Sequence, residues 1–108
     1  MDTIENIVLM VGLLEYTDYE SVPAKEFEDI VYNALSKHFP VERQVLVPNR
    51  CDGRRGFLDL VVDFNGEKVP IEIDRKLPRT KSIFKVCNFN PRLGYVITRS
   101  PFVVFKYT

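Results

Sequence analysis

The chain has 108 residues, and its 15 basic and 15 acidic side chains give a formal net charge of zero. With 45% hydrophobic and 28% charged residues, the composition excludes a disordered chain and fits one domain, residues 1–108. No apolar run is long enough to span a membrane, and Asp2 and Glu5 stand where a secretory signal needs basic residues, so we expect a cytoplasmic protein. Zero net charge also argues, at first sight, against a nucleic-acid partner.

Two helices are predicted at the start of the chain. Helical spacing of apolar residues over 3–14 predicts the first, and the region 1–20 is interpreted as a helical extension of a core formed by 21–108. Pro23 opens the second helix, which runs to about His38 and is ended by Pro40. Phe27, Val31 and Leu35 lie on its apolar face.

The period of apolar residues then changes from that of a helix to that of strands. Strands are predicted over 41–47, 57–64, 67–76, 94–99 and 102–107, with one helix over 79–90. The aromatic residues of this part are expected in the core: Phe84, Phe89, Tyr95, Phe102 and Phe105. The order α-α-β-β-β-α-β-β describes a small α/β (α+β) domain with a mixed central sheet flanked by helices.

The hairpin around Asn65-Gly66 carries the candidate chemistry. A two-residue Asn-Gly turn fixes the strand register. It places apolar residues opposite one another on the core face, as Val62–Val69, Leu60–Ile71 and Leu58–Ile73. On the other face Asp63 lies opposite Lys68 and Asp59 opposite Glu72, with Asp74 and Lys76 following on the same side.

Opposed carboxylates at Asp59 and Glu72 repel each other, with Cβ atoms roughly 4.5–5.5 Å apart. A Mg²⁺ ion, for which Mn²⁺ can substitute, removes this conflict, since Mg²⁺ binds through a few carboxylates and keeps several waters. The alternative is a solvated polar face on which arginines pair with the two carboxylates.

These residues resemble the motif of the PD-(D/E)XK nuclease superfamily, which has the restriction-endonuclease-like fold. The resemblance lies in the order strand, Asp59, hairpin, then Glu72-Ile73-Asp74-Arg75-Lys76, and it covers about residues 21–108. It implies Mg²⁺ ligands at Asp59 and Glu72, and a lysine that positions the attacking water. It also implies a glutamate on the preceding helix, for which Glu28 is the candidate, with Glu26 as the alternative.

The chain departs from this pattern because Asp74, not lysine, stands two residues after Glu72. In one reading Asp74 joins Asp59 and Glu72 as a ligand, and the lysine role passes to Lys76 or to the following helix, at Lys81 or Lys85. In the other, Asp74-Arg75-Lys76 is itself the motif. The hairpin register favours the first reading, and Lys76 is the leading candidate in both.

Charge is divided along the chain. Residues 1–40 hold eight acidic and two basic side chains, a net −6, whereas residues 41–108 hold seven acidic and thirteen basic ones, a net +6. Six basic residues around the carboxylates are the candidates for binding a DNA backbone: Arg54, Arg55, Arg75, Arg79, Lys81 and Lys85. About half of the basic side chains are expected to form ion pairs with acidic residues instead.

The leading hypothesis is therefore a Mg²⁺-dependent DNA endonuclease, expected to be a homodimer because so small a domain offers a single cutting centre. A second hypothesis is a non-catalytic DNA-binding module, or a nuclease-fold subunit of a larger complex. A third is a module whose basic strip binds an acidic partner protein.

Overall fold

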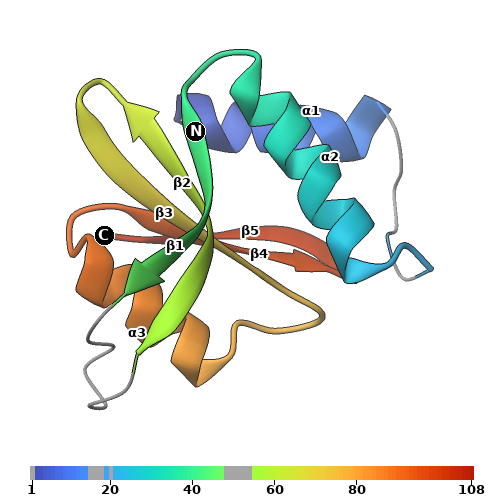
Figure 1. The fold of residues 1–108 in the computed structure, drawn as a ribbon. Helices are drawn as coiled ribbons and strands as arrows, with labels where there is room; N and C mark the ends of the chain where they lie inside the picture. The colour runs from blue at the N-terminus through green and yellow to red at the C-terminus, as the bar shows by residue number, and fades with distance from the viewer. Residues whose placement is uncertain (1, 15–18, 20, 48–54) are drawn as a thin grey trace.

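The computed structural model describes residues 2–14, 19, 21–47 and 55–108, and only the backbone of 11–14; it confirms the predicted order of elements (Figure 1). The helices are α1 (Thr3–Leu14), α2 (Ala24–Ser36) and α3 (Thr80–Phe89). The strands are β1 (Val41–Val47), β2 (Gly56–Phe64), β3 (Glu67–Asp74), β4 (Gly94–Arg99) and β5 (Phe102–Tyr107).

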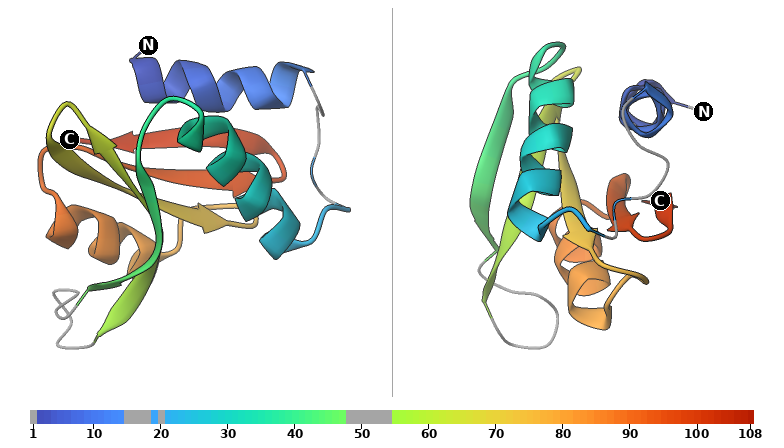
Figure 2. Two further views of the ribbon diagram at one scale, coloured as in Figure 1. Left: turned by 45° about the horizontal axis from the view of Figure 1, so that its top comes forward. Right: turned by 90° about the vertical axis from the view of Figure 1, so that its right-hand side faces the viewer.

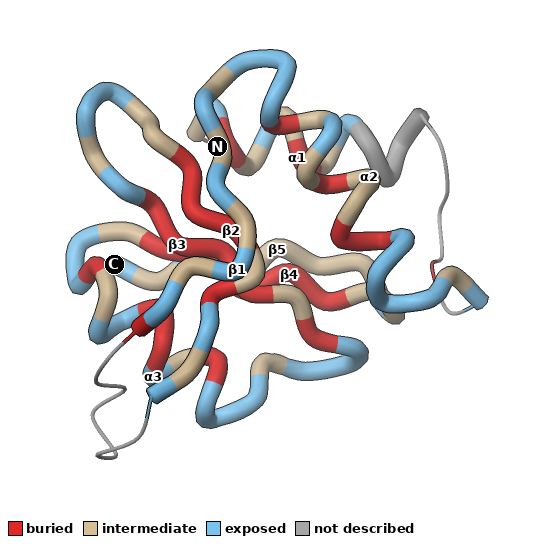
Figure 3. The backbone as a smooth tube through the Cα atoms, in the orientation of Figure 1, coloured by how far each residue is buried: buried red, intermediate tan, exposed pale blue. Residues whose placement is uncertain are grey.

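The five strands form one mixed sheet in the order β1-β2-β3-β4-β5, in which only β3 and β4 are parallel. Helices α1 and α2 lie against one side of the sheet and α3 against the other (Figures 1 and 2). Two apolar clusters follow from this, one of which includes Phe27, Val31 and Ile71 while the other includes Val61 and Val86. The buried positions concentrate where the strands cross the middle of the molecule (Figure 3).

The turn at Asn65-Gly66 forms as predicted, with φ angles of 52° and 79° that match a two-residue hairpin turn. The register is confirmed from Phe64–Glu67 to Leu60–Ile71. Leu58 is the exception, because it packs in the cluster with Val61 and not with Leu60. The first part of β2 therefore turns away from β3, and simple alternation fails there.

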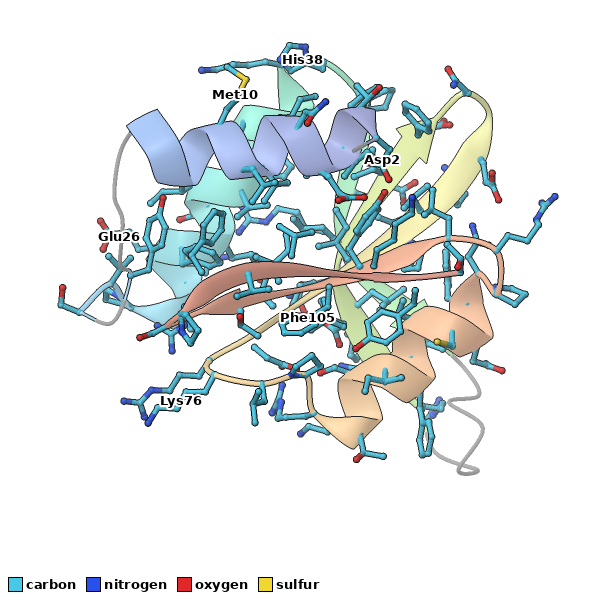
Figure 4. All side chains as sticks on the ribbon, turned by 180° about the vertical axis from the view of Figure 1, so that it is seen from behind. Asp2, Met10, Glu26, His38, Lys76 and Phe105 are labelled. Carbon is cyan, nitrogen blue, oxygen red and sulfur yellow. The ribbon has the colours of Figure 1, made fainter. Side chains whose placement is uncertain are left out.

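Strand β3 ends at Asp74, two residues before the predicted end at Lys76. The Arg75 carbonyl still accepts backbone hydrogen bonds from Arg99 (3.1 Å) and Ser100 (2.9 Å) at the end of β4. The chain leaves the sheet after it, where the Asp74 side chain accepts a hydrogen bond from the Arg79 backbone N–H. Lys76 is exposed and points away from the sheet (Figure 4). The prediction that strand alternation places Lys76 beside the carboxylates is thus wrong.

Helix α3 buries a different face from the one expected. Its buried residues are Ser82, Lys85 and Val86, whereas Phe84 is 38% exposed, so the prediction of Phe84 in the core is wrong. The other predicted aromatic residues pack in or against the two clusters, as expected: Phe89, Tyr95, Phe102 and Phe105. A lysine therefore occupies the side of α3 that faces the sheet.

The acidic start of the chain contacts its basic end. The Tyr95 hydroxyl donates a hydrogen bond to Asp2, and Lys106 forms ion pairs with Asp2 (3.1 Å) and Glu5 (3.7 Å). Opposite charges that are distant in sequence thus fasten α1 to the sheet. None of the described helices is long and apolar enough to cross a membrane.

Candidate metal and catalytic site

Asp59 and Glu72 meet where β2 and β3 separate. The backbone N–H of Asp59 donates to Glu72 Oε2 (3.1 Å), and the backbone N–H of Ile73 donates to Asp59 Oδ2 (2.9 Å). Each carboxylate therefore bonds the main chain of the opposite strand just beyond the last backbone pair, Leu60–Ile71. The structure brings these two predicted ligands together, and the hairpin register fixes where they meet.

Lys85 of α3 completes this arrangement. Its ammonium group forms an ion pair with Glu72 Oε1 and donates a hydrogen bond to the Phe57 carbonyl (3.0 Å). The side chains of Glu72 and Lys85 are only 2% and 11% exposed. The three side chains form the Asp59–Glu72–Lys85 cluster, in which a buried carboxylate lies beside a second carboxylate and a buried lysine.

Burial raises the pKa of Glu72 to about 8, and the hydrogen bond and negative charge of Asp59 act in the same direction. Lys85 opposes this shift by hydrogen bonding and by its positive charge. Glu72 thus holds a proton more readily than an ordinary carboxyl group does, although Lys85 favours its charged form. A displaced pKa at a pair of carboxylates is typical of functional sites.

This displacement predicts how stability depends on pH. The folded pKa of Glu72 lies above its unfolded value of 4.5, so the stabilisation is complete below pH 4.5 and is lost as pH rises through 8. The native protein is expected to lose about 4 kcal/mol of unfolding free energy through this group between pH 5 and pH 9, and Glu72→Gln is expected to abolish that part of the pH dependence. Urea unfolding of both proteins from pH 5 to 9 measures it, and parallel pH profiles would contradict the assignment.

Asp74 is held by donors at the start of α3. Its side chain, which is fully buried, accepts hydrogen bonds from the backbone N–H and Nε of Arg79 (both 2.8 Å) and from Ser82 Oγ (3.0 Å). Asp74 therefore fixes where α3 begins, and through α3 it sets the position of Lys85. The sequence predicts Asp74 as a ligand, and the structure adds this anchoring contact.

Asp74→Asn separates the two roles. If Asp74 anchors α3, the substitution is expected to lower the unfolding free energy by about 2 kcal/mol in metal-free buffer, since the asparagine amide cannot accept from all three donors. The loss of a metal ligand alone would cost nothing under these conditions. Urea unfolding in EDTA gives the measurement. The control is Asp63→Asn, at a partly exposed carboxylate, and it is expected to stay within about 0.5 kcal/mol of the native protein. Equal stability of all three proteins would rule out the anchoring role.

Glu28 is buried on α2 as the helical pattern predicts, but it serves a different ion-pair network. Arg43 of β1 pairs with Glu28, through Nε at 3.1 Å, and with Asp29 (2.6 Å), and Lys25 lies 3.4 Å from Glu28. This network lies between α2 and β1, whereas the Asp59–Glu72–Lys85 cluster faces α3. In the described part of the chain, no three His, Cys, Asp or Glu side chains gather closely enough for a metal ion. The alternative residue, Glu26, is exposed at the start of α2 (Figure 4).

The predicted DNA-binding side chains divide into two groups. Lys85 is buried and pairs with Glu72, whereas Arg79 is exposed but pairs with Asp74. Arg55, Arg75, Lys76 and Lys81 are exposed. Within the residues that the structure describes, Arg55, Lys76 and Lys81 form no ion pair. Arg54 lies outside the described residues.

The sequence predicts one feature of the site only as an alternative and does not predict another. Lys85 was considered only as an alternative, although a lysine among the inward positions of α3 is a usable signal. Gln44, which lies between the pairs Arg43–Leu60 and Val45–Leu58 and so opposite Asp59, has a φ angle of 53°. This is uncommon for glutamine, and such strained positions cluster at functional sites. Nothing in the sequence signals it.

Comparisons with known proteins do not add to this picture. No family model matches the chain, and neither the curated proteins nor the solved structures contain a match. The function is therefore inferred from the side chains of the site itself.

Proposed function

We propose that this chain is a cytoplasmic Mg²⁺-dependent DNA endonuclease of the PD-(D/E)XK type, with Asp59, Glu72 and Lys85 as its catalytic residues. The observation that carries the proposal is the meeting of the two carboxylates and the lysine where β2 and β3 separate. In this proposal Lys85 takes the role that the sequence favoured for Lys76, because Lys85 contacts the second carboxylate and Lys76 does not.

The carboxylate pair fits the requirements of Mg²⁺. This ion is commonly held by one or two carboxylates together with waters and substrate phosphate oxygens, so a third protein carboxylate is not needed. Asp59 and Glu72 would hold it, and when bound it would lower the pKa of a water and neutralise charge on the phosphate. Asp74 contributes by fixing the start of α3.

The chain's own residues have separate tasks in this proposal. Asp59 and Glu72 supply negative charge at one place, and the Ile73 and Asp59 backbone N–H groups hold both carboxylates in position. The Lys85 ammonium group is oriented by its hydrogen bond to the Phe57 carbonyl, and it can donate a second hydrogen bond to the attacking water. The exposed Arg75, Lys76 and Lys81 supply positive charge for the DNA backbone.

A second function is favoured by the burial of Glu72 beside Lys85. In that arrangement the buried charge is balanced without a metal ion, which suits a non-catalytic DNA-binding module of the same fold. Such a module would bind DNA through its exposed basic residues, and its affinity would fall with salt.

One experiment distinguishes the two functions. The full chain is incubated with supercoiled plasmid, branched DNA and single-stranded DNA, each with Mg²⁺, Mn²⁺ or EDTA, and the products are separated on gels. The endonuclease is expected to cut in either metal and not in EDTA. Salt-sensitive DNA binding without cutting, and without heat of metal binding in calorimetry, would favour the binding module.

A further inference from the structure

A pair of large apolar side chains is exposed at the outer end of the β1–β2 hairpin. Leu46 and Phe57 are register partners on the two strands, and they are 46% and 54% exposed. The other exposed large apolar residues of the described chain are Met10 on α1, Leu77 after β3 and Phe84 on α3. Only Leu46 and Phe57 are paired across two strands, and together they form a small apolar surface.

This surface borders an open hollow of about 550 Å³, whose described lining is Leu46, Arg55, Gly56 and Phe57. Arg55 is the only charged residue of that lining, and it is exposed. Gly56 has no side chain that could cover the neighbouring ring. An aromatic ring beside an arginine, with no acidic group in the described lining, matches the stacking sites of proteins that bind single-stranded nucleic acid.

The main chain of one lining residue, Phe57, contacts the Asp59–Glu72–Lys85 cluster. Lys85 donates a hydrogen bond to the carbonyl of Phe57 while it forms an ion pair with Glu72. Phe57 precedes Asp59 by two residues, which is about 7 Å along a strand. A base stacked on Phe57 would therefore bring the neighbouring phosphate close to the two carboxylates.

We infer that Leu46 and Phe57 stack an unpaired base, with Arg55 on the adjoining phosphate, so that the substrate is DNA with a single-stranded segment beside the cut. The inference rests on the proposed function and names its substrate class. A continuous duplex does not satisfy this surface, because its bases are already stacked on one another. A partner protein does not fit either, since two side chains supply far less than the roughly 800 Å² that each partner buries in a stable interface.

The test measures binding without catalysis. Fluorescence anisotropy in EDTA compares a labelled single-stranded oligothymidylate with a blunt duplex of equal length. Phe57→Ala is expected to weaken single-strand binding about 5- to 100-fold, and to weaken duplex binding much less. Phe57→Tyr keeps the ring and is expected to stay within about twofold of the native protein. Met10→Ala, an equally exposed apolar residue on α1, is the matched control and is expected to change neither affinity (Figure 4).

Two results would overturn the inference. One is an unchanged single-strand affinity in Phe57→Ala. The other is a native dimer in light scattering that Phe57→Ala dissociates with no loss of single-strand affinity, since this surface would then be an interface between copies of the chain.

The proposed endonuclease function is tested separately, by measuring DNA cleavage in Mg²⁺. Single-strand binding that depends on Phe57, together with no cutting in any metal, supports the stacking surface and rejects the endonuclease. Metal-dependent cutting with full single-strand affinity in Phe57→Ala rejects the stacking surface and supports the endonuclease.

Discussion

Asp59→Asn is expected to lower the rate of metal-dependent DNA cleavage by at least about 100-fold while the protein stays folded. The substitution removes one of the two negative charges that would hold the metal ion. Asn keeps an oxygen that can accept the hydrogen bond from the Ile73 backbone N–H. It also removes the negative charge that raises the pKa of Glu72, so the pair of Glu72 and Lys85 is expected to persist.

Asp63→Asn is the matched control for this prediction. Asp63 lies on the same strand, four residues further, and its side chain is 39% exposed, with Oδ2 4.0 Å from the Lys68 ammonium group. Cleavage rates of plasmid and branched DNA are compared for both variants at equal folded fractions, which circular dichroism verifies. Asp63→Asn is expected to cut at the native rate. Equal activity of the two variants, or full activity of Asp59→Asn, would remove Asp59 from the proposed site.

The hairpin shows which parts of this site follow from sequence. Asn65-Gly66 allows one tight turn, and counting outward from it places Asp59 opposite Glu72 with no further information. The structure brings these two carboxylates together as that count requires. Local turn chemistry was sufficient because the register propagates along the strands by backbone hydrogen bonds.

The position of the site lysine does not follow from the hairpin register. Alternation beyond Glu72 favours Lys76, but β3 ends at Asp74 because that side chain bonds the start of α3. Whether Lys85 or Phe84 faces the sheet depends on the rotation of α3, which packing against β2, β3 and β4 decides. A short helix with mixed residues around its circumference does not reveal this rotation in its own sequence.

The division of charge was likewise visible in sequence, and it predicted ion pairs for about half of the basic side chains without naming the partners. Acidic residues of the first 40 positions pair with basic residues of the sheet, as in Glu28 with Arg43 and Asp2 with Lys106. These contacts fasten α1 and α2 to the strands. Among the described residues, Arg55, Lys76 and Lys81 are exposed and take part in no such ion pair, so a chain of zero net charge still has basic side chains available for the proposed contact with DNA.

Lys85→Met is expected to lower the unfolding free energy by about 3 kcal/mol and to abolish cleavage. Removing one member of a buried ion pair leaves the other charge without its partner, and here it also leaves the Phe57 carbonyl without its donor. Protonation limits the cost, because burial and Asp59 already raise the pKa of Glu72 to about 8. Urea unfolding at pH 7 measures the loss.

The double variant Glu72→Gln/Lys85→Met distinguishes a catalytic pair from a merely structural one. With both charges removed, stability is expected to return to within about 1 kcal/mol of the native protein, since well-packed neutral groups can replace a buried ion pair without loss. Cleavage is expected to remain absent, although the fold is restored. Because stability and activity then separate, lost activity cannot be attributed to unfolding. Restored cleavage in the double variant would show that the pair only supports the fold, and a strictly additive loss of stability would show that the two side chains do not interact.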